Sequence, residues 1–249
     1  MSTNKITIIT VVYNGESLIE RTIKSVITQS FNSIEYIIVD GLSTDNTLYK
    51  LAPYKSQISQ IVSEKDNGIY DAMNKGLKLA TGEYILFLNA GDEFFSTNTL
   101  TTIFNTTQTA DVYYGNTAIT APNGHILGDR RLTPPEKLNW KSLKHGMCVS
   151  HQSFIAKREL CTPYDTTNKI SADYDWVINV LKKSKNIVNT HIYISKFLVG
   201  GASNKNQKQG LKERFKIMIK HYGLIQTLYS HVFILLRYPI HKLTKKSMT

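Results

Sequence analysis

Short apolar runs alternate with stretches of helical spacing along the N-terminal part of the chain. Runs rich in β-branched residues are typical of buried parallel strands, and four are predicted here: Ile6–Tyr13, Glu35–Asp40, Ile58–Ser63 and Glu83–Asn89. Between them, apolar residues recur every three or four positions, which predicts helices over Ser17–Gln29, Asn46–Tyr54 and Ile69–Ala80. This alternation predicts βαβ units and an α/β fold, with a mostly parallel sheet flanked by helices on both faces.

The pattern changes after Asp92. A hairpin is predicted around Pro122-Asn123-Gly124, and two further strands are expected with a helix between them, over Met147–Ala156, Asp173–Lys182 and Asn189–Phe197. From Leu211 to Leu243 the spacing becomes helical and amphipathic, with Lys and Arg among Phe, Ile, Leu and Tyr. We therefore expect one α/β domain over residues 1–204 and a basic amphipathic helical tail over residues 205–249.

The positive charge belongs to the tail. Of the net +11, residues 1–204 carry 20 Lys and Arg against 18 Asp and Glu, whereas residues 205–249 carry 10 against the single acid Glu213. A nearly neutral domain argues against a nucleic-acid partner. The tail is predicted to lie on an anionic membrane surface; the alternative is a helical pair packed on the domain. Its longest stretch without charged residues, His221–Leu236, is shorter than the roughly 20 residues of a spanning helix.

The N-terminus and the cysteines indicate the compartment. Ile6–Tyr13 lacks the basic leader and cleavage site of a secretion signal. Cys148 and Cys161 form no disulfide framework and no metal-binding pair, and are expected as free thiols. We therefore expect a cytoplasmic protein.

Acidic residues follow three of the predicted strands. Asp40, Asp66 and Asp92 come at or just after strand ends, and in parallel sheets ligands bind at this edge. Grouped carboxylates repel one another unless a cation or a hydrogen-bonding ligand lies between them. A divalent cation holding a diphosphate meets this need, and the hard oxygen ligands suit Mn²⁺ or Mg²⁺. Neither GxGxxG nor GxxxxGK[ST] is present, which argues against dinucleotide and P-loop binding.

Several motifs, in order, resemble the family 2 glycosyltransferases of the GT-A fold. More narrowly, they resemble the bacterial surface-polysaccharide branch, which includes colanic-acid and O-antigen transferases. The resemblance is close from Ile6 to about Asp92 and looser to about Lys182. It is carried by the runs IITVVYN (8–14), IVDGLSTDNT (38–47), NGIYDAMNKG (67–76), TGE (81–83) and FLNAGD (87–92).

The resemblance implies a GT-A catalytic domain over residues 1–204, with a donor half over about 1–115 and an acceptor half over about 116–204. Val11 and Tyr13 match the positions that line the nucleoside of a nucleotide sugar. Asp40 matches the acid that hydrogen-bonds the base, usually uracil. Asp71 and Asn74 match the helix beside the donor phosphates and sugar.

The metal motif departs from the family pattern. Asn89, Ala90, Gly91 and Asp92 occupy the place of Asp-x-Asp followed by another Asp, so Asp92 alone keeps a carboxylate. We expect Asp92 to bind Mn²⁺ or Mg²⁺ with the diphosphate, more weakly than two carboxylates would. Glu93 is adjacent, but a solvated acid at the start of a helix is expected there.

The catalytic base is expected in the segment SADYDW (171–176). The resemblance places it on Asp173, and an inverting transferase needs such a carboxylate to take the proton of the acceptor hydroxyl. A helix N-terminus would lower the pKa of Asp173. A helix cap is the structural alternative, and Asp175 is the reserve candidate. His151 opens HQSFIAKR, a segment that recurs in the branch, and is expected to touch the donor diphosphate, the metal or the acceptor; a core histidine with satisfied hydrogen bonds is the structural alternative.

These expectations combine into one function. The chain is predicted to be an inverting glycosyltransferase that moves a sugar from a nucleotide sugar, usually a UDP-sugar, to a polyprenyl-diphosphate-linked saccharide. It would act in O-antigen, capsule or exopolysaccharide biosynthesis, on the inner face of the bacterial plasma membrane. The alternatives are a sugar nucleotidyltransferase, which usually has a Gly-rich basic loop after its first strand, and an inactive GT-A binding module.

Overall fold

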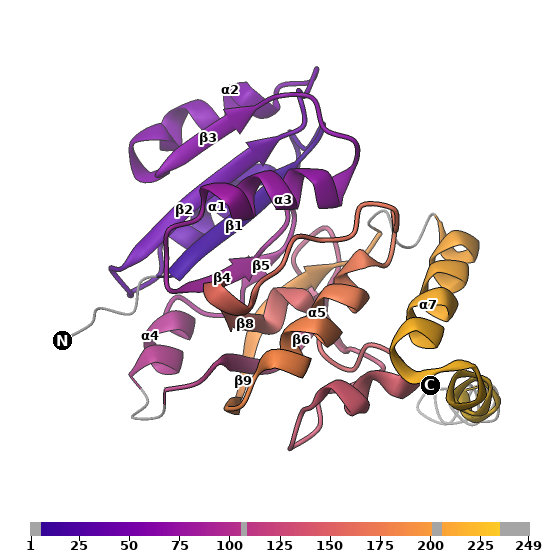
Figure 1. The fold of residues 1–249 in the computed structure, drawn as a ribbon. Coiled ribbons are helices and arrows are strands. Elements are labelled where there is room, and N and C mark those ends of the chain that lie inside the picture. The colour runs from indigo at the N-terminus through magenta and orange to yellow at the C-terminus, as the bar shows by residue number, and fades with distance from the viewer. Residues whose placement is uncertain (1–5, 106–108, 201–205, 235–249) are drawn as a thin grey trace.

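Four parallel strands form the N-terminal half of the sheet (Figure 1). The structure, a computed structural model, describes residues 6–105, 109–200 and 206–234. β1 (Ile6–Val12) lies between β2 (Ile34–Asp40) and β4 (Tyr84–Phe87), and β3 (Gln60–Ser63) pairs with β2. Every residue of β1 is buried, as expected for a strand that is covered on both faces. The predicted parallel βαβ arrangement is confirmed.

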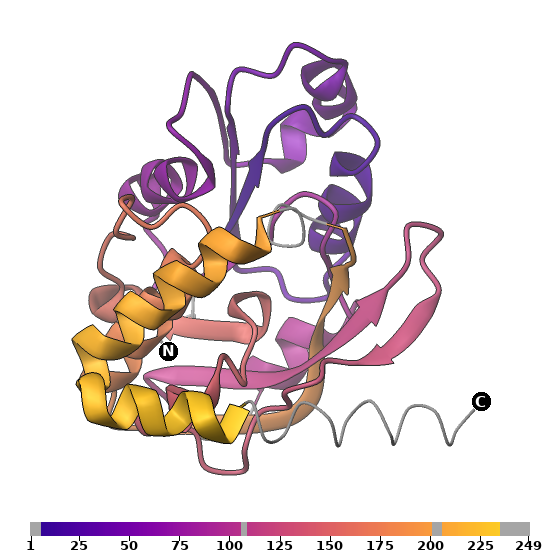
Figure 2. The same ribbon diagram turned by 90° about the vertical axis from the view of Figure 1, so that its right-hand side faces the viewer.

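The sheet continues into a mixed C-terminal half, in the order β3-β2-β1-β4-β8-β6-β9-β5. β8 (Phe154–Lys157) runs antiparallel to both β4 and β6 (Val112–Thr120), and β9 (Ile187–Leu198) runs parallel to β6. The predicted hairpin is formed by β6 and β7 (Ile126–Asp129), and it projects from the domain in Figure 2. The remaining strand, β5 (Glu93–Phe94), pairs with β9.

Alternate residues of the central strands enter two separate cores. Ile6 and Ile8 of β1 pack on the side of α1 (Ile19–Ile27), α2 (Thr47–Leu51) and α4 (Thr99–Phe104). Ile9 and Val11 pack on the side of α3 (Ile69–Leu79) and α5 (Ala172–Lys183). The two-residue period of a strand produces this division, so the sheet is a middle layer between helices.

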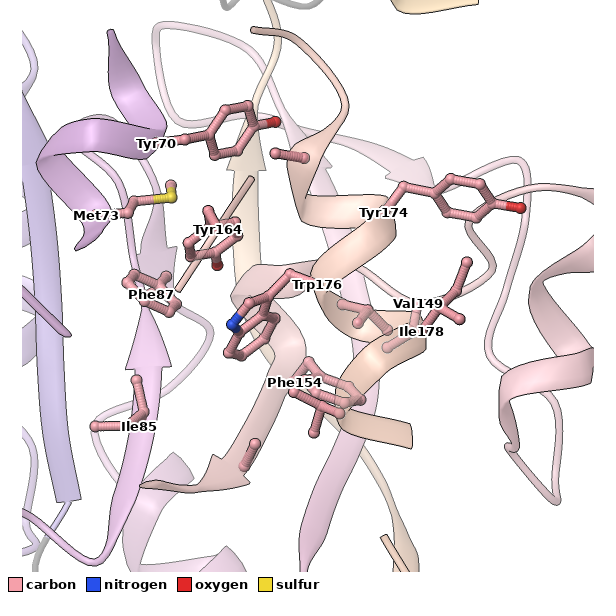
Figure 3. Close-up of a cluster of buried hydrophobic side chains, with 14 of the residues drawn as sticks. Tyr70, Met73, Ile85, Phe87, Val149, Phe154, Tyr164, Tyr174, Trp176 and Ile178 are labelled. Atoms are coloured by element: carbon pink, nitrogen blue, oxygen red, sulfur yellow. The ribbon is translucent and has the colours of Figure 1, made fainter. Parts of the chain in front are cut away.

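Aromatic side chains join α5 to the sheet (Figure 3). Trp176 of α5 is fully buried; its ring stacks on Tyr164 at 5.2 Å between centroids and meets the edge of Phe87 at 5.5 Å. Tyr164 in turn stacks on Tyr70 of α3 at 5.3 Å. Such buried pairs contribute beyond their burial, and they fix the start of α5 relative to α3 and the sheet.

One predicted strand is shorter than expected. Met147–Ala156 was predicted as continuous, but the described strand is Phe154–Lys157, and His151–Ser153 forms a 3₁₀ turn before it. The turn buries Gln152 and Ser153, whose polar atoms find hydrogen-bond partners inside the domain. The apolar residues on either side of the turn have the sequence pattern of a strand, which is why a longer strand was predicted.

The described part of the tail forms two helical segments. α7 (Gln207–Tyr222) ends at Gly223, whose φ of 81° is a conformation that favours glycine, and residues 224–234 are again helical. α7 packs on the domain through buried Ile217 and Met218. The packed alternative therefore holds for α7, while the predicted helix beyond residue 234 lies outside the described residues. In the described ranges, no helix combines the length and the apolar character that crossing a bilayer requires.

Candidate active site

A cavity of about 620 Å³ opens beyond the carboxyl ends of β1 and β4. The loops after these strands form its floor, α3 forms one wall, and the segments before α5 and after β9 close it. Of the predicted site residues, seven line it: Val11, Tyr13, Asn89, Ala90, Asp92, His151 and Asp173. The fold thus brings together residues from distant parts of the sequence.

The Asn89–Asp92 turn follows β4 and carries one buried carboxylate. Asp92 Oδ1 accepts a hydrogen bond from Leu198 N at 3.0 Å, and Oδ2 accepts one from Gln152 Nε2 at 2.8 Å. Burial raises the pKa of Asp92 to about 6, although these hydrogen bonds oppose the rise. This carboxyl group therefore titrates close to neutral pH.

The geometry of the turn explains the missing second acid. Gly91 has a φ of +100°, and a Cβ there would lie 3.0 Å from the Leu198 side chain. A side chain at this position would strain the backbone and crowd β9. Gly91 does not line the cavity with its neighbours; it shapes the turn that presents them.

Asn89, His151 and Asp173 form a connected polar chain across the cavity. Asn89 Nδ2 lies 3.2 Å from His151 Nε2, and His151 Nδ1 lies 3.3 Å from Asp173 Oδ2. The amide nitrogen of Asn89 can only donate, and the roles of the two His151 nitrogens depend on the tautomer of the ring. Asn89 Oδ1 is buried and has no hydrogen-bond partner among the described residues.

Asp173 is held as a carboxylate by its neighbours. Its Oδ1 accepts from Tyr174 N at 2.9 Å and lies 3.1 Å from the Tyr70 hydroxyl. Burial raises the pKa of Asp173, but the hydrogen bond and field of His151, the charge of Arg214 and the Tyr70 hydrogen bond outweigh it, so the pKa lies below its ordinary value. Neighbouring side chains thus lower the pKa of Asp173. Ser171, not Asp173, is the N-cap residue of α5.

Asp40 lies beneath the cavity and not at its surface. It is fully buried, and its Oδ2 accepts from Ser63 Oγ at 2.6 Å and from Ser43 N at 3.1 Å. The acid that does reach the cavity on this side is Asp66, close to Tyr13.

Two predicted residues of α3, Asp71 and Asn74, do not line the cavity. Asp71 accepts from the backbone N–H of Asn67 at 2.9 Å, and so fixes the start of α3. Asn74 exchanges two hydrogen bonds with the backbone of Tyr164, at 2.7 and 3.0 Å. Both side chains stabilise α3, which lines one side of the cavity.

Two other acids are committed to ion pairs. Asp175, the reserve candidate for the base, is buried and contacts His221 Nε2 at 2.6 Å and Lys220 Nζ at 3.0 Å, which ties α5 to α7. Glu93 lies in β5, where it accepts from Arg21 Nε at 2.8 Å. The expectation of a solvated acid at a helix start was wrong for Glu93, because β5 pairs with β9 and places it beside Arg21.

Among the cavity residues, Tyr70 and Gln152 were given no individual role by the sequence, and Asp66 was expected only as one of the acidic strand ends. Each lies in or beside a predicted motif: Asp66 follows the third predicted strand, Tyr70 lies in NGIYDAMNKG, and Gln152 follows His151. Their direction toward the cavity depends on the tertiary packing.

An acidic turn at the strand ends and a second carboxylate across one cavity, on this α/β sheet, define the class of GT-A glycosyltransferases. The chain belongs to the family described as glycosyl transferase family 2, which matches residues 7–161.

The sequence matches with relatives cover most of the chain. The PGL/p-HBAD biosynthesis glycosyltransferase of Mycobacterium bovis is 29% identical over 206 residues, 77% of this chain and 76% of that protein. The UDP-Glc:alpha-D-GlcNAc-diphosphoundecaprenol beta-1,3-glucosyltransferase WfgD of Escherichia coli is 25% identical over 233 residues, 92% of this chain and 89% of that protein.

Solved structures share the fold. S. aureus TarS 1-349 in complex with UDP matches with a TM-score of 0.66 at 19% identity over 86% of this chain; it is the longer protein, and the match covers 64% of it, less than two thirds. Glucosyl-3-phosphoglycerate synthase from Mycobacterium tuberculosis, solved with Mn²⁺, UDP and glucosyl-3-phosphoglycerate, matches with a TM-score of 0.60 at 14% identity over 89% of this chain and 81% of that one. These likenesses confirm the GT-A fold.

Proposed function

We propose that this glycosyltransferase moves a sugar, with inversion, from a UDP-sugar to a polyprenyl-diphosphate-linked saccharide in O-antigen, capsule or exopolysaccharide biosynthesis. One observation carries the proposal: the Asn89–Asp92 turn and the ionised Asp173 face one cavity and are joined through His151. The name of the E. coli relative, with its UDP-glucose donor and diphosphoundecaprenol acceptor, supports the choice of substrates. The UDP held by two similar structures supports the donor.

The nucleoside is proposed to bind at the Val11 and Tyr13 end of the cavity. Tyr13 is 63% exposed, so its ring is available to a planar base. The base-reading role predicted for Asp40 is proposed to pass to Asp66, because Asp66 lines the cavity whereas Asp40 is fully buried.

The Asn89–Asp92 turn is proposed to hold Mn²⁺ or Mg²⁺. The described residues contain no group of three His, Cys, Asp or Glu side chains that would form a metal site alone. Asp92 and Asn89 nevertheless line the cavity with side chains that carry hard oxygens, and donor phosphates would complete such a shell. A bound cation would neutralise charge on the departing diphosphate. Mn²⁺ in the mycobacterial synthase structure supports this assignment.

The proposed reaction step needs a base on the acceptor side. The acceptor hydroxyl attacks the anomeric carbon while its proton passes to the Asp173 carboxylate, and the bond to the UDP leaving group breaks on the opposite face. His151 and Tyr70 hold Asp173 in place and ionised. His151, in contact with both Asn89 and Asp173, is proposed to orient the base relative to the donor side.

Family membership decides against the sugar nucleotidyltransferase alternative. The inactive-module alternative rests on the motif being reduced to Asp92. Slow hydrolysis of the donor in the presence of Mn²⁺ would distinguish an active enzyme from a module that only binds.

A thermal-shift screen of nucleotide sugars tests the donor. UDP-sugars with Mn²⁺ are expected to raise the melting temperature, because a ligand at 100 times its dissociation constant stabilises the folded state by about 2.7 kcal/mol. GDP-mannose at the same concentration serves as the matched control and should shift it less. Equal shifts from UDP- and GDP-sugars, or none from either, would contradict a UDP-sugar donor.

Membrane association is proposed for the helical segment at residues 224–234, where small polar side chains are buried and large apolar ones are exposed. Thr227 and Ser230 are fully buried, whereas Ile225 and Tyr229 are 87% and 65% exposed. Leu224, Leu228 and Val232 extend this exposed apolar stripe. An exposed stripe within a basic tail fits the interface of an anionic bilayer. A lipid-linked acceptor would bring the enzyme to the cytoplasmic leaflet.

Vesicle flotation tests the stripe. The double variant Ile225→Gln, Tyr229→Gln is expected to lose most of its binding to vesicles with anionic phospholipid. Leu211→Gln is the matched control, because Leu211 is also exposed but lies on α7. Unchanged flotation of the double variant would contradict membrane binding by this segment.

A further inference from the structure

The carboxylate of Glu213 binds three consecutive backbone amides just before α5. Oε1 accepts from Lys169 N at 2.9 Å, and Oε2 accepts from Ile170 N at 2.8 Å and from Ser171 N at 2.9 Å. Glu213 belongs to α7, is 8% exposed and is the single acid of residues 205–249. Hydrogen bonds to a buried charged acceptor are stronger than neutral ones, so the segment 169–171 is firmly fixed to α7.

The same segment is held on its other side by α3. The Tyr70 hydroxyl lies 2.9 Å from Ile170 O and 3.1 Å from Asp173 Oδ1, and both oxygens can accept its single proton. Lys169 and Ile170 line the cavity, and Asp173 follows two residues after the last amide that Glu213 binds. The segment that leads into the proposed base is therefore clamped between α3 and α7.

α7 also approaches this segment closely one turn before Glu213. Gly210 is buried, and a Cβ there would lie 3.1 Å from the Ile170 side chain. Ser171 Oγ donates to Gly210 O at 3.2 Å. The three amide hydrogen bonds of Glu213, the Ser171 hydroxyl and the packing of Gly210 all join α7 to the segment that leads into α5.

We propose that Glu213 is a positioning residue, which sets the 169–171 segment so that Asp173 faces the acceptor side of the cavity. This inference rests on the proposed function of Asp173. It makes α7 a structural part of the active site. Deleting residues 205–249 would then impair transfer even when the membrane is absent.

Glu213→Gln is a sharp test because it keeps the shape of the side chain. Both carboxylate oxygens accept from backbone amides, so either orientation of a Gln amide turns an NH₂ group toward an N–H donor. We expect kcat to fall by about 10²-fold, the cost of displacing a reacting group by about 1 Å. The KM for the donor and the thermal shift with UDP and Mn²⁺ should stay close to those of the wild type. Lys220→Gln is the matched control, since it removes a contact of α7 with Asp175 but leaves the 169–171 segment untouched.

Hydrogen exchange provides a readout that does not depend on activity. The amides of residues 169–171 should exchange faster in Glu213→Gln and remain protected in Lys220→Gln. Unchanged exchange in Glu213→Gln would overturn the clamp, as would equal loss of kcat in both variants, or a parallel loss of UDP binding and transfer. If the wild-type protein transferred no sugar but the amides of residues 169–171 still exchanged faster in Glu213→Gln, the proposed function would be overturned. The role of Glu213 in holding the segment would remain supported.

Discussion

Replacing Asp173 by Asn is expected to abolish most sugar transfer while the donor still binds. Asn keeps the size of the side chain and one oxygen for the hydrogen bond from His151, but it cannot take a proton at neutral pH. General bases contribute about 10²–10⁴-fold to enzymatic rates, so kcat should fall by that factor. The measurement is UDP release with a diphospholipid-linked GlcNAc acceptor. The thermal shift with UDP and Mn²⁺ should be unchanged.

Asp175→Asn is the matched comparison, because Asp175 lies on the same helix but is bound to Lys220 and His221 outside the cavity. That variant should melt at a lower temperature, since a buried ion pair loses its charge, and its folded fraction should still turn over. Near-normal transfer by Asp173→Asn, or a complete loss in Asp175→Asn alone, would remove Asp173 from the role of the base.

The donor half of the fold was predicted well because its signals are local. Continuous β-branched runs such as Ile6–Tyr13 and helices with regular apolar spacing specify the elements, and glycines mark their ends. The error at Met147–Ala156 has the opposite origin. There, Gln152 and Ser153 are buried by distant partners such as Asp92, which no local pattern contains.

The lining of the cavity could not be predicted in full, because the sequence does not show in which direction each side chain points. The resemblance placed Asp92 and Asp173 on elements that do meet at one cavity. The pattern of residues could not show that Asp40 turns beneath the sheet edge while Asp66 reaches the surface. Likewise, amphipathic spacing in the tail could not show which of its side chains are buried, and at residues 224–234 these include Thr227 and Ser230.

Asp92→Asn is expected to weaken binding of the divalent cation and to reduce transfer more than the roughly 10–100-fold that loss of an outer-shell metal partner costs. The fold should tolerate the change. One oxygen can still accept from Leu198 N, and the Gln152 amide can turn over to offer its oxygen to the new NH₂ group. In thermal-shift measurements, the stabilisation by UDP alone should remain, whereas the additional stabilisation by Mn²⁺ should disappear. An unchanged Mn²⁺ effect would place the cation elsewhere.

The pH dependence of sugar transfer by the wild-type enzyme also tests whether Asp92 binds the metal. Burial raises the pKa of Asp92 to about 6, whereas the pKa of Asp173 lies below its ordinary value. Asp92 therefore becomes protonated first as the pH falls, and transfer should decline below about pH 6 while Asp173 is still ionised. Saturating Mn²⁺ should move this decline to lower pH, because the cation competes with the proton for the same oxygens. The stability of the unliganded protein has the opposite sign: its folded state binds more protons than the unfolded chain between pH 3.8 and about 6, so this group contributes less stability as the pH rises through that window. If the decline of sugar transfer at low pH did not depend on the Mn²⁺ concentration, Asp92 would not be the residue that binds the metal.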